Sequence, residues 1–168
     1  NWFGKCPGGE AGVRETFVSA ITDANLITFN LGVNNFGTYF TERLTAMLGM
    51  GGSSDDDSLA DLALTPALSA QTKQIKTNVA DKLSELTDGK SETVQMVNDL
   101  AGVLAYCYAG FVINFDADMD LICKLNPDAQ IIVMGLPNML EGVKLEYNGL
   151  TIDLVSLFGS IIDMANLH

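Results

Sequence analysis

Basic residues are scarce in this chain of 168 residues. Nine lysines and arginines stand against 21 aspartates and glutamates, so the formal net charge is −12 at pH 7. A negative field of this size repels the phosphate backbone of nucleic acids and anionic membrane surfaces, and the sequence offers no basic stripe that would bind them. We therefore exclude nucleic-acid binding as a function.

Cysteine and histidine are also rare. The three cysteines, Cys6, Cys107 and Cys123, form no CxxC pair of the kind that binds zinc, and they are too few for a disulfide scaffold. The one histidine, His168, is the final residue, which is a poor place for a general base. We expect neither a metal nor an organic cofactor.

Long apolar segments are missing as well. The longest stretch without a charged residue, 100–115, has 16 residues, whereas a helix that crosses a bilayer needs about 20. We therefore interpret it as a buried helix, expect no membrane span, and assign its aromatic residues to the core: Tyr106, Tyr108, Phe111 and Phe115. The N-terminal residues contain no export signal and no initiator Met, which predicts a piece of a longer protein.

What is present is an alternation of strand and helix patterns. Two β-prone apolar runs, 26–31 and 130–135, are typical of strands buried in a parallel sheet. Apolar residues recur at helical spacing in five further segments, which we predict to be helices: 13–23, 38–50, 58–64, 67–86 and 91–125. The order of strand, helices and strand is typical of an open α/β sheet with crossover connections.

The C-terminal quarter predicts a hairpin followed by a helix. Asn148-Gly149 is the strongest two-residue hairpin signal, because both turn positions must tolerate positive φ. The flanking strands are expected near 143–152, and an amphipathic helix over 153–168. With 48% hydrophobic residues the chain can bury one core, so we predict a single domain over 1–168.

Two stretches resemble conserved blocks of the SGNH-type (GDSL) serine hydrolases. The first, ANLITFNLGVNN (24–35), looks like the strand that ends in the family's Gly-x-Asn-Asp block, with Asn35 where the family has Asp. The second, LNPDAQIIVMGLPN (125–138), looks like the Asn-Pro-x-Ala lead into the family's next strand and its Gly-x-Pro turn. The resemblance implies a flavodoxin-like three-layer sandwich, incomplete here, and hydrolysis of a small carboxylic ester through an acyl-serine intermediate.

The resemblance also implies an oxyanion hole. In the family the asparagine of Gly-x-Asn-Asp donates a hydrogen bond to the oxyanion, and Asn34 stands in that place. A glycine in the loop before the first short helix donates its backbone N–H, and the candidates in loop 6–12 are Gly8, Gly9 and Gly12, with Gly9 preferred and Gly12 as its alternative. Without the resemblance, an Asn after a strand is more often a turn cap.

The family's nucleophile and base have no counterpart in this sequence. The Gly-Asp-Ser motif belongs upstream of both blocks, whereas Asp57-Ser58 comes after the first and follows no apolar strand. The Asp-x-x-His motif is not matched either, because Ala165 stands three residues before His168. We therefore expect the intact parent protein to be a serine esterase or lipase, and this fragment to be inactive.

Two alternatives stay open. The chain could be a degenerate relative that keeps the fold and uses its acidic surface as a non-catalytic binding or scaffold domain. It could also form a homodimer in which a second copy pairs with an exposed edge of the sheet.

Two acidic runs, 55–57 and 116–120, are interpreted as solvated. The second begins like a calcium loop, but Leu121 stands where the loop needs Gly and Pro127 where it needs a bidentate Glu.

Overall fold

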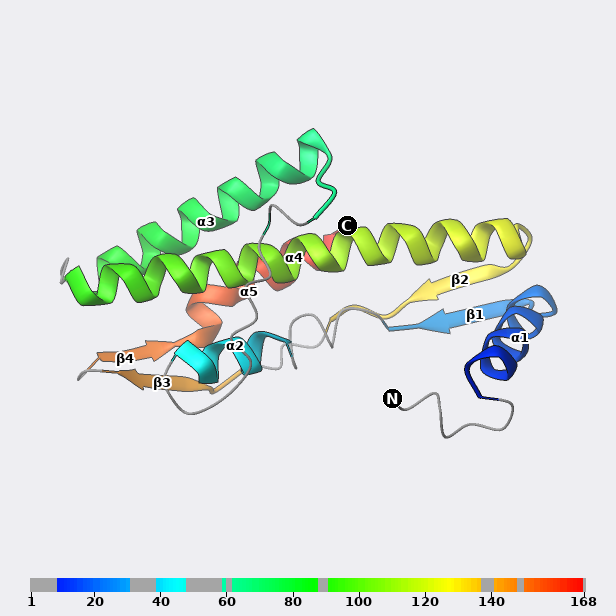
Figure 1. The fold of residues 1–168 in the computed structure, drawn as a ribbon, viewed down its shortest axis with the longest axis horizontal. Coiled ribbons are helices and arrows are strands. Elements are labelled where there is room, and N and C mark those ends of the chain that lie inside the picture. Colours follow the sequence, from blue (N-terminus) through cyan, green and yellow to red (C-terminus); the bar gives the residue numbers. More distant parts are fainter. Residues whose placement is uncertain are drawn as a thin grey trace. The chain divides into compact units, whose positions relative to one another are not determined.

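The structure, a computed structural model, describes residues 9–30, 39–47, 59, 62–87, 91–136, 141–147 and 150–167. These ranges contain five helices and four strands (Figure 1), so the protein is a mixed α/β protein in which helix predominates. By its internal contacts the chain divides into two compact units, residues 1–30 with 114–134 and residues 31–113 with 135–168. The single domain stays a prediction, and we describe each unit by itself.

The first unit contains a parallel pair of strands. Strand β1 (Leu26–Phe29) pairs with β2 (Gln130–Val133), with Leu26 opposite Gln130 and Phe29 opposite Val133. The ladder extends beyond both ends, because the Gln130 N–H donates to the Asn25 oxygen at 3.0 Å and the Met134 N–H donates to the Phe29 oxygen at 2.9 Å. The two strands and their parallel pairing are confirmed.

Helix α1 (Gly9–Thr22) precedes β1, and the end of α4 (Ser91–Leu125) precedes β2. Helix α1 begins four residues earlier than the predicted start at residue 13, so the part of the predicted loop from Gly9 onward is helical. Glycine residues favour a loop, but each one lowers the stability of a helix by only about 1 kcal/mol. Gly9 and Gly12 lie in the first turn of α1, where this cost is tolerated.

The prediction that β1 and β2 are buried is wrong. Phe29 is half-buried, with its ring 6.2 Å from that of Phe115 on α4. On the opposite face of the sheet, Leu26, Ile132 and Met134 are 51%, 52% and 51% exposed. Parallel strands bury both faces only where further layers cover them, and the described part of this unit pairs two strands.

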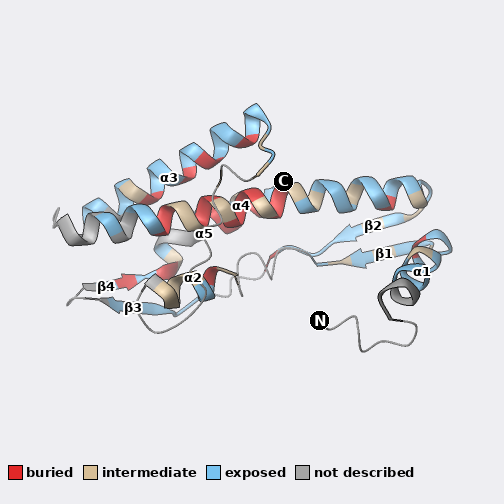
Figure 2. Cartoon of the chain, viewed as in Figure 1, coloured by how far each residue is buried: buried red, intermediate tan, exposed pale blue. Residues whose placement is uncertain are grey.

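The first unit therefore has little core of its own. Six of the eight large hydrophobic side chains that are exposed among the described residues belong to it, while its buried hydrophobic residues are Ile21 and Ile122 (Figure 2). In the second unit the burial is concentrated in the middle of α4.

Asn126 holds the first unit together by hydrogen bonding. Its side-chain amide nitrogen donates to three backbone oxygens at the end of α1 and the start of β1, those of Ile21 at 2.8 Å, Thr22 at 3.2 Å and Ala24 at 2.7 Å. The last carbonyls of a helix lack partners within the helix, so this one side chain caps α1. The Asn-Pro pair also ends α4, because the residue before a proline is disfavoured in helical conformation.

The second unit is built from the rest of α4 with α2 (Phe40–Met47), α3 (Pro66–Thr87), a hairpin and α5 (Leu154–Leu167). The hairpin consists of β3 (Lys144–Tyr147) and β4 (Leu150–Asp153), with Tyr147 opposite Leu150. The antiparallel hairpin is thus confirmed, although its turn residues Asn148 and Gly149 lie outside the described residues.

The core of the second unit collects apolar residues from five elements, α2, α3, α4, β4 and α5. Helix α3 turns Leu68, Thr72, Ile75 and Val79 inward at spacings of three and four, and it contacts both β4 and α5. The largest fully buried side chains are Tyr108, Ile75, Leu100, Leu104, Ile152, Ile161 and Cys107. The predicted buried helix over 100–115 is confirmed, with Tyr108 and Phe111 buried and with Tyr106 and Phe115 half-buried.

Two helices begin at capping residues. The Thr65 hydroxyl accepts a hydrogen bond from the Leu68 N–H at 3.2 Å, and Pro66 is the first residue of α3, where a missing N–H costs nothing. Asp153 accepts from the Val155 N–H at 3.0 Å at the start of α5.

The same proline explains an error. Of the predicted helix over 58–64 the structure describes residues 59 and 62–64, and Leu59 is in a 3-10 helical conformation. Residues 62–64 are not helical, because Thr65 precedes Pro66 and is disfavoured in helical conformation, so that α3 begins only at Pro66.

Helix α4 meets the length and composition of a membrane-crossing helix over Asn98–Leu125. Half of its most apolar window is buried inside the protein. A core helix meets the same criterion, so the expectation of no membrane span stays a prediction.

We expect the variant Asn126→Ala to lower the free energy of unfolding by about 1–3 kcal/mol, because the carbonyls of Thr22 and Ala24 lose the Asn126 donor and that of Ile21 keeps only the Ala24 N–H. Urea denaturation followed by circular dichroism measures this loss, and hydrogen exchange should place it at the end of α1. Asn114→Ala is the matched control, since Asn114 is exposed on α4, the helix that ends just before Asn126. Equal stability of the two variants would contradict the capping role.

Candidate functional site

The candidate site begins at the carboxyl ends of β1 and β2. Since the two strands are parallel and paired to their last residues, Asn30 and Met134 leave the sheet at the same edge. Ligands of open α/β sheets bind beyond this edge. Asn34, the predicted oxyanion donor, follows β1 five residues after Phe29, and it lies outside the described residues, as do Gly32 and Asn35.

The second predicted donor falls on α1. Gly9 is the first residue of this helix and Gly12 lies in its first turn, while Gly8 lies outside the described residues. N–H groups at the start of a helix have no acceptor within the helix and favour negative charge. A backbone N–H at Gly9 therefore suits an oxyanion, and Gly12, deeper in the turn, suits it less well.

The other predicted features give no catalytic group in the described part. Asp55–57, Ser58 and His168 lie outside the described residues. Residues 116–120 belong to α4, where the side chains of Asp116, Asp118 and Asp120 are exposed and Lys124 pairs with Asp120 at 3.5 Å. Among the described residues no three acidic, histidine or cysteine side chains come close enough together to hold a metal ion.

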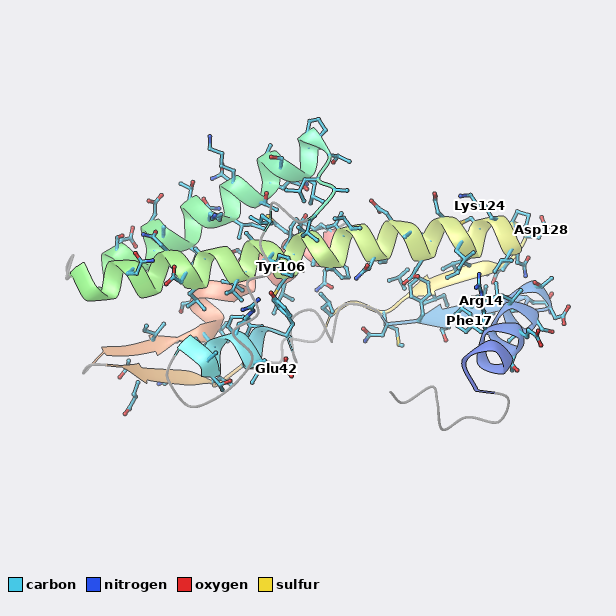
Figure 3. All side chains as sticks on the ribbon, in the orientation of Figure 1. Arg14, Phe17, Glu42, Tyr106, Lys124 and Asp128 are labelled. Atoms are coloured by element: carbon cyan, nitrogen blue, oxygen red, sulfur yellow. The ribbon has the colours of Figure 1, made fainter. Side chains whose placement is uncertain are left out.

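A cluster of aromatic rings and one guanidinium lies where α2 begins. The rings of Tyr39 and Tyr106 stack with their centroids 5.0 Å apart, so α4 meets the residue that directly precedes α2. Tyr106 is labelled on α4 in Figure 3. The Arg43 Nε donates to the Tyr39 hydroxyl at 3.1 Å, and its guanidinium carbon lies 5.3 Å from the Tyr39 ring centroid. Such contacts combine stacking, a hydrogen bond and a cation–π interaction.

Sequence reasoning missed this cluster. Tyr39 and Arg43 are four residues apart on a predicted helix, so they share a face of that helix. This spacing was the signal in the sequence that could have indicated their contact. Their pairing with Tyr106 depends on the fold. The cluster fixes the start of α2, which directly follows the segment that contains Asn34 along the chain.

Cys107, the neighbour of Tyr106 in the chain, is buried, and its thiol has a raised pKa. Burial raises the pKa of its thiol from the ordinary value of 9.0 to about 12, against smaller lowering effects of a backbone hydrogen bond and of the Arg43 charge. Because the thiolate is the reactive form of cysteine, Cys107 is not a nucleophile near neutral pH. Burial also raises the pKa of Tyr108.

Comparison with protein-family models, with curated proteins and with solved structures finds no match to this chain.

The raised pKa of Cys107 predicts a loss of stability in alkali. Below pH 9 the thiol is protonated in both states, and between pH 9 and 12 the unfolded chain releases a proton that the folded protein keeps. The free energy of unfolding should therefore fall by up to about 1.4 kcal/mol per pH unit from this group.

Urea denaturation at several pH values between 8 and 11 would measure this slope. Cys107→Ala should flatten it, while Cys123→Ala, at an exposed position, should leave it unchanged. An identical slope in both variants would show that Cys107 does not cause it.

Proposed function

We propose that this chain is part of an SGNH-type carboxylic ester hydrolase and contributes the oxyanion-stabilising residues of its active site. In this proposal the complete fold is a flavodoxin-like three-layer sandwich. The serine nucleophile and the histidine base come from residues outside this sequence, and these 168 residues alone are inactive.

One observation supports this proposal above the others. The two blocks that resemble the family follow two strands that are paired in parallel and in register, with Phe29 opposite Val133. The resemblance requires this arrangement, since both blocks must leave the same edge of the sheet, whereas antiparallel or unpaired strands would separate them. Helices connect the strands, as in a crossover unit.

The Asn-Pro block gains a physical reason from its contacts. Asn126 caps α1 through three hydrogen bonds and Pro127 ends α4, so this block sets the turns before both strands. The contacts of Asn126 give the Asn-Pro pair a structural role before both strands.

The exposed face of the sheet supports an incomplete sandwich. Leu26, Ile132 and Met134 form an apolar surface on the face opposite Phe115. In a three-layer sandwich a further layer of helices covers such a face, and neighbouring strands cover the edges.

The proposed chemistry of Asn34 is electrostatic. When a serine oxygen attacks the ester carbonyl, negative charge develops on the carbonyl oxygen, and a side-chain amide fixed beyond a strand can donate a hydrogen bond to it. The Gly9 N–H at the positive end of α1 is the second donor. Both donors act more strongly on the charged transition state than on the neutral ester.

We expect Asn34→Ala to lower the kcat of the native protein that contains these residues by about 10²–10³-fold, the usual effect of losing one oxyanion donor, with little change in KM. Hydrolysis of p-nitrophenyl acetate and butyrate measures both constants. Asn30→Ala is the matched control, because Asn30 is an exposed amide at the end of the same strand and should leave kcat unchanged.

Two outcomes would contradict this assignment. Equal activity of the Asn34→Ala and Asn30→Ala variants would remove Asn34 from the site. Reaction of the isolated 168-residue chain with a fluorophosphonate probe would place a reactive serine inside it, contrary to the proposal.

A second candidate function is a non-catalytic binding or scaffold domain. The observation that favours it is the net charge of −12 together with the missing triad motifs. A native protein that neither hydrolyses these esters nor reacts with the fluorophosphonate would support this candidate over the hydrolase.

A further inference from the structure

Asn166, in the last turn of α5, holds the backbone of a residue 30 positions earlier. The Leu136 N–H donates to the Asn166 Oδ1 at 2.6 Å, and the Asn166 Nδ2 donates to the Leu136 oxygen at 3.4 Å. One side-chain amide thus meets both polar groups of one buried backbone residue. The short bond to Oδ1 carries most of this interaction, because 3.4 Å is long for an N–H···O hydrogen bond.

Gly135 leaves the space that this contact needs. A Cβ at position 135 would lie 3.1 Å from the Asn166 Oδ1 and 3.5 Å from its Cγ. Gly142 is the glycine with positive φ in the described ranges, so the glycine at 135 is explained by close approach of a side chain. We call Gly135, Leu136 and Asn166 the amide latch.

The latch acts where the chain leaves β2. Val133 is the last residue of this strand, Met134 still pairs with Phe29, and Leu136 comes two residues later. Beyond a strand end the backbone loses its ladder partners, and an unpaired buried N–H costs about 1–3 kcal/mol. Asn166 supplies the missing partner at this point.

We propose that Asn166 is a positioning residue, which fixes the backbone at Leu136, in the segment that follows β2 along the chain. This inference rests on the proposed function, because the edge matters for catalysis only if the protein is a hydrolase. The latch itself is a property of the described residues.

Hydrogen exchange measured by NMR on the 168-residue chain tests the latch. Asn166→Ala should speed exchange of the Leu136 amide about ten-fold or more relative to the Leu104 amide, which reports opening of the core. Asn166→Asp should restore protection, since a carboxylate oxygen still accepts from the Leu136 N–H. Asn98→Ala, at an exposed helical Asn, is the control and should change neither amide.

A double-mutant comparison tests the role of Gly135. Gly135→Ala should speed exchange at Leu136 in the wild-type background, because its methyl group would push the Asn166 Oδ1 back by a few tenths of an ångström and weaken its bond to the Leu136 N–H. In the Asn166→Ala background the same change should have little further effect. Additive effects, or an Asn166→Ala variant with unchanged Leu136 exchange, would overturn the latch.

The positioning role is tested in the native protein by ester hydrolysis. Asn166→Ala should lower kcat by about ten-fold, since a small displacement of a site segment is costly, and Asn166→Asp should recover most of that loss. Activity that is unchanged in both variants would overturn the positioning role while leaving the hydrolase intact. A native protein without esterase activity would overturn the proposed function and this role, while the exchange result would still stand.

Discussion

The buried stripe along α4 is the constraint on which most of the structure depends. Between Leu100 and Val112 this 35-residue helix contributes more core residues than any other described element. In proteins most helical stability comes from packing of an apolar face, so this burial stabilises α4 itself as well as the core. Along the chain α4 directly precedes β2, and it ends at the Asn126-Pro127 pair. The middle part of the helix is buried in the protein, and half of its most apolar window is covered.

Two asparagine side chains form hydrogen bonds with backbone groups that lie beyond the ends of helices and strands. Asn126 supplies donors to the carbonyls at the end of α1, and Asn166 supplies an acceptor and a donor to Leu136 beyond the end of β2. In both places a helix or strand stops and its backbone groups need partners. A side-chain amide carries both a donor and an acceptor on a short stem, so it can replace the missing backbone partner.

Burial also changes the acid–base properties of two core side chains. Cys107 and Tyr108 are neighbours on α4, and removal of water raises the pKa of both side chains. The Arg43 charge offsets this for the thiol only in part. Both side chains therefore stay neutral further into the alkaline range than usual, and the proposed chemistry relies on amide groups at the edge of the sheet.

The amino-acid sequence by itself determined the secondary structure in most places, because local signals specify it: the Asn148-Gly149 pair indicates the hairpin, Pro127 ends α4, and the apolar runs at 26 and 130 mark the strands. Local signals did not predict that residues 62–64 before Pro66 are not helical, nor that Gly9 and Gly12 lie within α1. Only the tertiary structure decided which strand faces are covered, that Tyr106 stacks on Tyr39, and that Asn166 reaches Leu136. These depend on contacts between residues far apart in the chain, which no local pattern encodes.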